Sequence, residues 1–167
     1  MRVYHQVTPD SLESALTNGL KRTSRGEKGY DAAVTITDVI LDRDCPKELR
    51  EQGVSRDNNL YAYMPTETGV IDITDGADVP LKEFVEKSDQ ATLELDIDPR
   101  ECFVSDLDTF DALKEALANR EPSLTIQKLS HSYWSKVVPL HDYTPGTFNR
   151  PEIMIPYDVG PEHIKKV

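Results

Sequence analysis

The chain has 167 residues, of which 38% are hydrophobic and 29% are charged, and its formal net charge at pH 7 is −11. This length and mixed composition predict one folded domain spanning residues 1–167 and exclude an intrinsically disordered chain. The acidic balance argues against binding to nucleic acid or to an anionic membrane, because the sequence has no basic run that would attract phosphates.

The first twenty residues predict a short strand followed directly by a helix. β-Branched and aromatic side chains favour a strand over Arg2–Val7. Thr8 or Asp10 can cap the helix, and Gly19 can end it because glycine adopts the left-handed conformation readily. His5 is therefore expected on a strand just before a tight turn, which is a typical place for ligand contacts.

Hydrophobic periodicity predicts further short helices and strands along the chain. Helices are expected over residues 31–41, 80–88 and 106–118, where apolar residues recur at spacings of three and four, and over 47–52, which follows Pro46 and ends at Gly53. Strands are expected over residues 60–64, 91–97, 101–104, 152–155 and 163–167. Residues 66–78 are expected to form a loop with strand content at 70–73, and residues 130–138 a short helix or a turn.

Two features of the composition bear on location and metal binding. Cys45 and Cys102 are far apart and form no C-x-x-C motif, so neither a zinc site nor a disulfide framework is indicated, and we expect no metal. No secretory leader is evident, and no stretch approaches the roughly 18 apolar residues of a membrane span. We therefore expect a cytoplasmic protein that makes no membrane contact.

The middle of the chain contains an arginine and two tyrosines that could meet a ligand. Tyr61 and Tyr63 lie on the same face of the strand expected over 60–64, because strand side chains alternate. They are either two half-buried core aromatics or a platform for a planar ring. Arg56, in the turn before this strand, either pairs with Asp57 and the acidic surface or binds phosphate, to which a guanidinium bonds in bidentate fashion.

Two stretches resemble the ADP-ribosyltransferase superfamily. Members often begin with a strand that carries Tyr-His-x-Thr, followed by a helix of the form Asn-Leu-x-Ser-Ile-Leu-x-x-Gly-Leu. The matching residues here are Tyr4, His5 and Thr8, then Ser11–Leu16, then Gly19 and Leu20. The second stretch, residues 149–164, resembles the end of several bacterial members, in which a glutamate opens an apolar strand that is followed by a proline and a turn; here that residue is Glu152. The order of histidine, tyrosine and glutamate resembles the His-Tyr-Glu form of the family's active site.

The resemblance implies an α+β fold with a split, mostly antiparallel sheet and short flanking helices. It also implies that NAD is a substrate whose ADP-ribose is transferred to a macromolecular acceptor. The residues expected to act in catalysis are Glu152, His5 and Tyr61. The residues expected to contact NAD are His5, Thr8, Arg56, Tyr61 and Tyr63. Cleavage of the nicotinamide–ribose bond passes through an oxocarbenium-like state, and a carboxylate near the developing charge would stabilise it.

Two departures from the family and two alternatives remain. Gln6 follows His5, where members often carry glycine or another small residue. Arg150 stands where arginine-modifying members carry a glutamate, which argues against an arginine acceptor. The acidic charge favours a protein acceptor over nucleic acid, and toxin-like members of this kind can have a neutralising partner protein. The first alternative is a catalytically silent domain of the same fold that binds a protein or a nucleotide. The second is an α+β interaction module in which His5 bonds its core neighbours and Glu152 is only the first residue of a strand.

Overall fold

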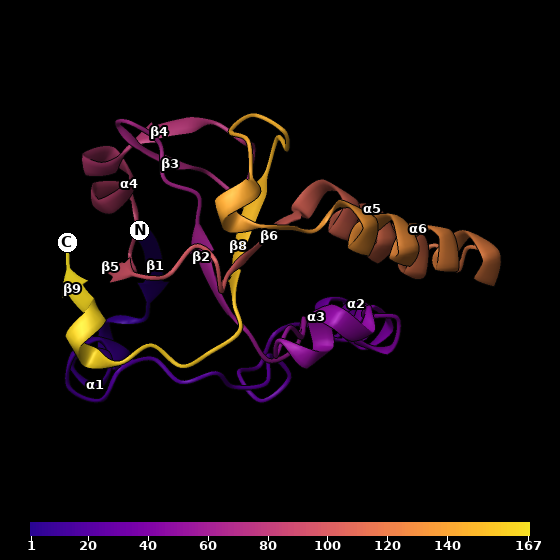
Figure 1. Ribbon diagram of the computed structural model, residues 1–167, viewed down its shortest axis with the longest axis horizontal. Helices are drawn as coiled ribbons and strands as arrows, with labels where there is room; N and C mark the ends of the chain where they lie inside the picture. Colours follow the sequence, from indigo (N-terminus) through magenta and orange to yellow (C-terminus); the bar gives the residue numbers. More distant parts are fainter.

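The computed structural model describes residues 1–167 and has an α+β fold, as expected; it is built on one seven-stranded sheet (Figure 1). The strand order is β7-β6-β8-β2-β1-β5-β9, and every neighbouring pair is antiparallel. The strands are β1 (Arg2–Val7), β2 (Leu60–Tyr63), β5 (Ala91–Asp96), β6 (Phe103–Asp106), β7 (Val138–Pro139), β8 (Pro151–Ile155) and β9 (Ile164–Lys166). A separate hairpin consists of β3 (Gly69–Ile71) and β4 (Asp78–Pro80). The strands predicted from the sequence are confirmed to within about two residues at most ends, which is the usual spread of boundaries.

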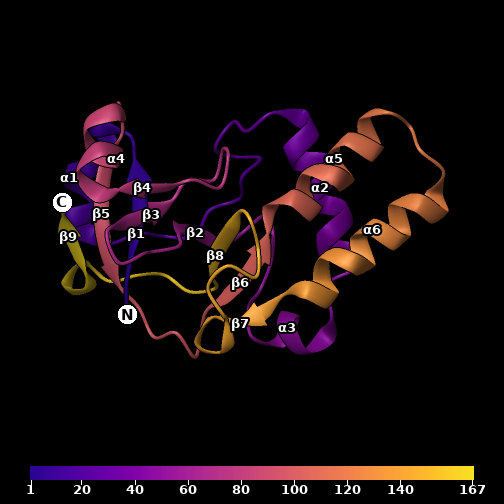
Figure 2. The same cartoon turned by 90° about the horizontal axis from the view of Figure 1, so that it is seen from above.

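Six α-helices flank the sheet in two groups, which Figures 1 and 2 show at opposite ends of the molecule. The helices are α1 (Leu12–Asn18), α2 (Ala32–Arg43), α3 (Lys47–Glu51), α4 (Leu81–Lys87), α5 (Leu107–Ala118) and α6 (Ser123–Lys136). Helices α2, α3, α5 and α6 gather at the end of the sheet formed by β6 and β8, and α1 and α4 lie at the other end. None of these helices combines the length and the apolar character that a bilayer span requires.

Of the two predictions for residues 130–138, the helix is confirmed up to Lys136, but it is not short, because α6 starts at Ser123. Its buried residues include Ser130, Tyr133 and Trp134, whereas Leu124 is 60% exposed. Polar and aromatic residues on the buried face hide the apolar spacing on which the prediction depended.

Local sequence explains where the main helices begin and end. The Asp31 carboxylate accepts a hydrogen bond from the Val34 amide at 2.9 Å and caps α2, and Asp106 caps α5 in the same way. Helix α1 ends at Gly19, whose φ of 81° and ψ of −178° are almost exclusive to glycine. A Cβ at this position would lie 2.4 Å from the carbonyl oxygen of Val159, so glycine also permits the C-terminal segment to approach.

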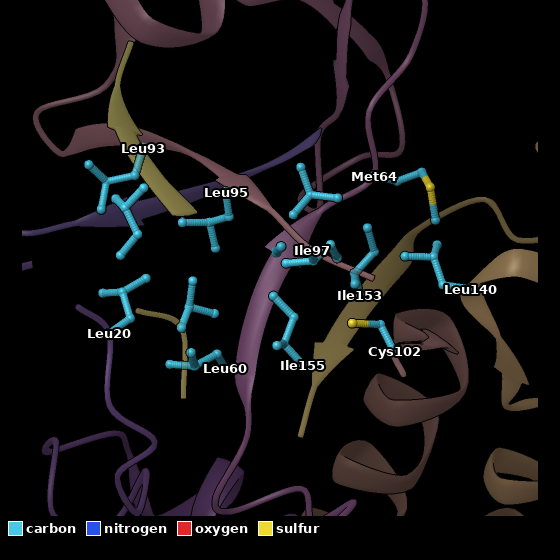
Figure 3. Close-up of a cluster of buried hydrophobic side chains, with 14 of the residues drawn as sticks. Leu20, Leu60, Met64, Leu93, Leu95, Ile97, Cys102, Leu140, Ile153 and Ile155 are labelled. Carbon is cyan, nitrogen blue, oxygen red and sulfur yellow. The ribbon is translucent and has the colours of Figure 1, made fainter. Parts of the chain in front are cut away.

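Two apolar clusters lie on opposite faces of the sheet. The first is formed mainly by β1, β2, β5 and β8 and the segments that follow them; Figure 3 shows most of its large side chains, among them Leu60, Leu93, Leu95 and Ile153. The second lies between the sheet and helices α2, α5 and α6, and includes Met154. Side chains alternate along β8, with Ile153 and Ile155 in the first cluster and Met154 in the second. Glu152 therefore points to the same side of the sheet as Met154, toward the helices.

Helix α2 presents an unusual face to the protein. Its buried residues are Thr37, Asp38 and Leu41, while the apolar Ile36 and Val39 are 53% and 60% exposed. The sequence predicts the helix but does not identify the face that packs. The reason is electrostatic, because Asp38 is directed into a buried cluster of charges that is described below.

Candidate functional site

A cavity of about 200 Å³ brings together four of the residues singled out from the sequence. His5, Tyr61, Tyr63 and Glu152 all line it, although they come from three different strands. Its other lining residues include Arg25 and Tyr30 from the loop between α1 and α2.

The pairing of the strands explains this convergence. Strand β1 pairs with β5 along its whole length but with β2 only where Tyr4 lies opposite Tyr63. On the other edge of β2, Tyr63 lies opposite Glu152 of β8. The cavity therefore opens where β1 and β2 stop pairing, and the glutamate lies one strand away from this junction.

His5 bridges the junction with its side chain. Its Nδ1 lies 2.6 Å from the carbonyl oxygen of Tyr61. A carbonyl only accepts hydrogen bonds, so Nδ1 must carry the proton. Burial lowers the pKa of His5 below its ordinary value. The ring is therefore neutral at physiological pH, and its Nε2 is an acceptor suited to a ligand hydroxyl.

This histidine should make stability depend on pH. The pKa of His5 is lower in the folded state than its ordinary value of 6.5, so the unfolded chain binds more protons as the pH falls below about 6.5. We expect the free energy of unfolding to decrease in that range, and to decrease less in His5→Gln, whose amide can still donate to the Tyr61 carbonyl. Urea denaturation between about pH 5 and pH 8 measures both proteins. Identical pH dependence in the two proteins would contradict this assignment.

Beneath the cavity lies a cluster of four buried charges, Arg25, Asp38, Arg56 and Glu152, here called the buried ionic cluster. Arg25 donates two hydrogen bonds to Asp38, at 2.8 and 2.5 Å. Arg56 Nη1 lies 2.6 Å from Glu152 Oε2, and its Nε lies 3.5 Å from Asp38. Two positive and two negative groups balance, which lets the charges stay inside the protein.

The structure does not place two of the predicted NAD contacts at the cavity. Arg56 is completely buried, so its guanidinium cannot reach a pyrophosphate and instead pairs with Glu152 from behind. Thr8 lies at the exposed end of β1, where its hydroxyl bonds that of Ser11 at 2.8 Å. Arginine side chains are rarely fully buried, which is why the sequence predicts a surface position for Arg56.

The two tyrosines of β2 have different roles in the structure. Tyr61 donates its hydroxyl hydrogen to the carbonyl oxygen of Arg56, and the Cζ atoms of Arg25 and Arg56 lie 4.9 and 4.7 Å from the centre of its ring. It therefore forms the wall between the cavity and the buried ionic cluster. Tyr63 donates to Gln6 at 3.1 Å and contacts Phe84 edge-on.

Sequence reasoning missed Arg25 and Tyr30, because the loop that carries them resembles a solvated polar loop. The loop is held by Asp57, whose Oδ1 accepts hydrogen bonds from Ser24 and from the Arg25 amide at 3.0 Å. Such contacts between distant residues leave no local pattern in the sequence. Tyr30 is 50% exposed, so its ring is available at the mouth of the cavity.

A second cavity, of about 640 Å³, adjoins the first and shares Gln6, Tyr63 and Ile73 with it. Its charged lining residues are Asp72, Asp75, Asp78, Glu83, Lys87 and Asp89. The single lysine is bonded to Glu83, so the second cavity is strongly acidic. Arg25 is the one cationic residue that lines the first cavity, and Lys28 lies near it, close enough that burial and the arginine's charge lower the pKa of the lysine. The site therefore has an acidic region in the second cavity and a basic region around Arg25 in the first.

The site combines a neutral histidine acceptor, tyrosine rings and a single carboxylate at the end of the cavity. This set can hold hydroxyl groups and a planar ring and can stabilise positive charge. No group of three or more His, Cys, Asp or Glu side chains is arranged to hold a metal ion. Comparisons of the chain with protein-family models, with curated proteins and with solved structures give no match.

Proposed function

We propose that the protein is an NAD-dependent ADP-ribosyltransferase with a split-sheet α+β fold of that family. One observation carries the proposal: His5, Tyr61 and Glu152, chosen from opposite ends and the middle of the sequence by their resemblance to the family, line one cavity. The single residue pair between β1 and β2 supports a sheet that is split at this point.

In the proposed reaction, the bond between ribose C1′ and the nicotinamide nitrogen breaks, and its electron pair remains on the nicotinamide, which leaves neutral. Positive charge develops on C1′ and the ribose ring oxygen, where the Glu152 carboxylate stabilises it. The acceptor's nucleophilic atom then bonds to C1′ and releases its proton to solvent. His5 Nε2 accepts a hydrogen bond from a ribose hydroxyl, and Tyr63 or Tyr30 stacks on the nicotinamide. Tyr61 packs against the arginines of the buried ionic cluster and so supports the part of the cavity wall next to Glu152.

The polarity of the site supports an orientation for NAD. The pyridinium ring of NAD is cationic and suits the side that faces the acidic cavity, whereas the pyrophosphate suits Arg25, the one cationic residue that lines the first cavity. A cavity of about 200 Å³ is small for a dinucleotide, because typical ligand pockets are about 300–1,000 Å³. Part of NAD must therefore lie outside it. The carboxylates beside the site favour a protein acceptor over nucleic acid.

Titration of NAD into the purified protein tests the proposal. We expect binding by calorimetry and an NAD-dependent rise in melting temperature, since a ligand that binds only the folded state stabilises it. His5→Ala should bind at least about tenfold more weakly, the loss of one well-placed polar contact. His163→Ala is the matched control, because His163 is exposed and lies away from the cavity. Absence of heat and of any melting shift at millimolar NAD would refute the proposal.

A catalytically silent domain of this fold is the second candidate. It is favoured by the commitment of Glu152 Oε2 to Arg56 and of the Tyr61 ring to two guanidinium groups. Such a domain would bind NAD or another nucleotide without releasing nicotinamide. Measurement of free nicotinamide after incubation with NAD separates the two candidates, because only the enzyme produces it.

A further inference from the structure

Arg56 is fully buried, yet it uses only part of its hydrogen-bonding capacity. Its Nη1 donates to Glu152 Oε2 at 2.6 Å and to the Tyr133 hydroxyl oxygen at 3.0 Å. Its Nε and Nη2 are buried and have no hydrogen-bond partner. Buried polar groups are nearly always satisfied, so an arginine left partly unsatisfied calls for an explanation other than stability.

The surroundings offset this arrangement only in part. The Cζ atom of Arg56 lies 4.6 Å from the centre of the Phe110 ring and 4.7 Å from that of Tyr61, which provides cation–π attraction. Apolar residues that replace a buried ion pair often give equal or higher stability. The retained guanidinium is therefore better explained by what it contacts, and Glu152 is the only carboxylate that lines the 200 Å³ cavity.

Arg56 is itself held from several directions. Its backbone amide donates to Asp42 Oδ1 at 2.5 Å, and its carbonyl oxygen accepts from the Tyr61 hydroxyl. The hydroxyl of Tyr133, on α6, donates in turn to the sulfur of Met154, two residues after Glu152 on β8. The guanidinium is therefore fixed relative to the strand that carries the glutamate.

We propose that Arg56 is a positioning residue for Glu152. It holds Oε2 from behind the cavity and leaves Oε1, which makes no hydrogen bond within the chain, to act on the ligand. The charge-assisted bond holds the carboxylate in one orientation, with Oε2 bound to Arg56. This role rests on the proposed function, because it concerns the cleavage of the nicotinamide–ribose bond.

The test is steady-state kinetics of nicotinamide release by wild type, Arg56→Lys, Glu152→Gln and the double variant. Lysine keeps the charge, but it lacks the rigid guanidinium plane that holds Nη1 between Glu152 and Tyr133. We expect Arg56→Lys to lower kcat by about 10- to 100-fold, because a displaced reacting group loses rate, with KM within about threefold. In the Glu152→Gln background the same change should have no further effect, since Arg56 acts only through Glu152. Arg43→Lys, at an exposed arginine bonded to Asp44, is the control.

A second variant keeps the proposal testable if Arg56→Lys folds poorly. Tyr133→Phe removes only a hydroxyl, and it should lower kcat about 2- to 10-fold, the size of one hydrogen bond, again only when Glu152 is present. Effects that multiply in the double variants would overturn the role of Arg56. So would a raised KM with unchanged kcat, which would mark Arg56 as a ligand contact. A wild-type protein that releases no nicotinamide would remove the proposed function first, and this role with it.

Discussion

Glu152→Gln is expected to lower the rate of nicotinamide release by about 10²- to 10³-fold, the usual loss when a group that stabilises transition-state charge is removed. Glutamine has nearly the same shape and still offers an oxygen to Arg56, but it has no charge to oppose the developing oxocarbenium ion. The ground state of NAD carries less charge at the ribose than the transition state, so NAD affinity should change by only a few-fold. Parallel measurements of turnover and of calorimetric binding give the two numbers.

Glu94→Gln is the matched control for this substitution. Glu94 lies on β5 of the same sheet and also faces an arginine, with 3.9 Å between its Oε1 and Arg2 Nε, but it lies outside both cavities. It should keep wild-type turnover. Equal turnover by wild type and Glu152→Gln would show that the carboxylate has no part in the chemistry, even if NAD binds.

Asp38→Ala should destabilise the fold by about 3–5 kcal/mol, the effect of removing one partner from a buried ion pair. Asp38 is completely buried and lies against both Arg25 and Arg56. Without it, two guanidinium groups face only Glu152, and one positive charge is left uncompensated inside the protein. Urea denaturation monitored by the single tryptophan, Trp134, measures the change, because Trp134 is buried and bonded to α2.

Asp44→Ala provides the comparison for Asp38. Asp44 receives two hydrogen bonds from Arg43, both at 2.8 Å, in the same bidentate geometry that Arg25 makes with Asp38. This pair lies nearer the surface, and exposed pairs contribute about 0–1 kcal/mol. A similar small loss at both positions would show that the buried ionic cluster is well solvated and does not hold α2 in place.

Much of the secondary structure was predictable because it depends on residues that are close together in the sequence. Strand alternation over 91–97 and the cap at Asp106 each need only a few neighbouring residues. The face of α2 was not predictable, because Asp38 is buried by two arginines that are distant in the sequence. The start of α6 at Ser123 was missed because its buried face contains polar residues.

The residues of the candidate site also fall into those that local sequence predicts and those that depend on tertiary packing. His5 and Glu152 were identifiable because each sits in a recognisable strand context, and the structure places both at one cavity. Arg25 and Tyr30 depend on how a polar loop folds back onto the sheet, which no local spacing records. The sequence predicts a functional role for Arg56, but its burial behind Glu152 follows only from the packing of α2, α6 and β8 around it.

Helix α2 buries a polar face and exposes apolar residues, and this arrangement affects how readily the helix can detach from the protein. Helices usually stay docked through apolar burial, but α2 has Ile36 and Val39 in solvent, and Leu41 is its only fully buried apolar side chain. Its attachment therefore relies largely on two acidic residues: Asp38, which pairs with Arg25 and Arg56, and Asp42, which accepts from the Arg56 amide. The arginine that holds Glu152 thus also helps to hold α2. A local opening of α2 would release Arg25 and Arg56 together and dismantle the cavity wall while the sheet stays intact. Faster amide hydrogen exchange in α2 should accordingly accompany a loss of binding at the site, as two signs of a single opening event.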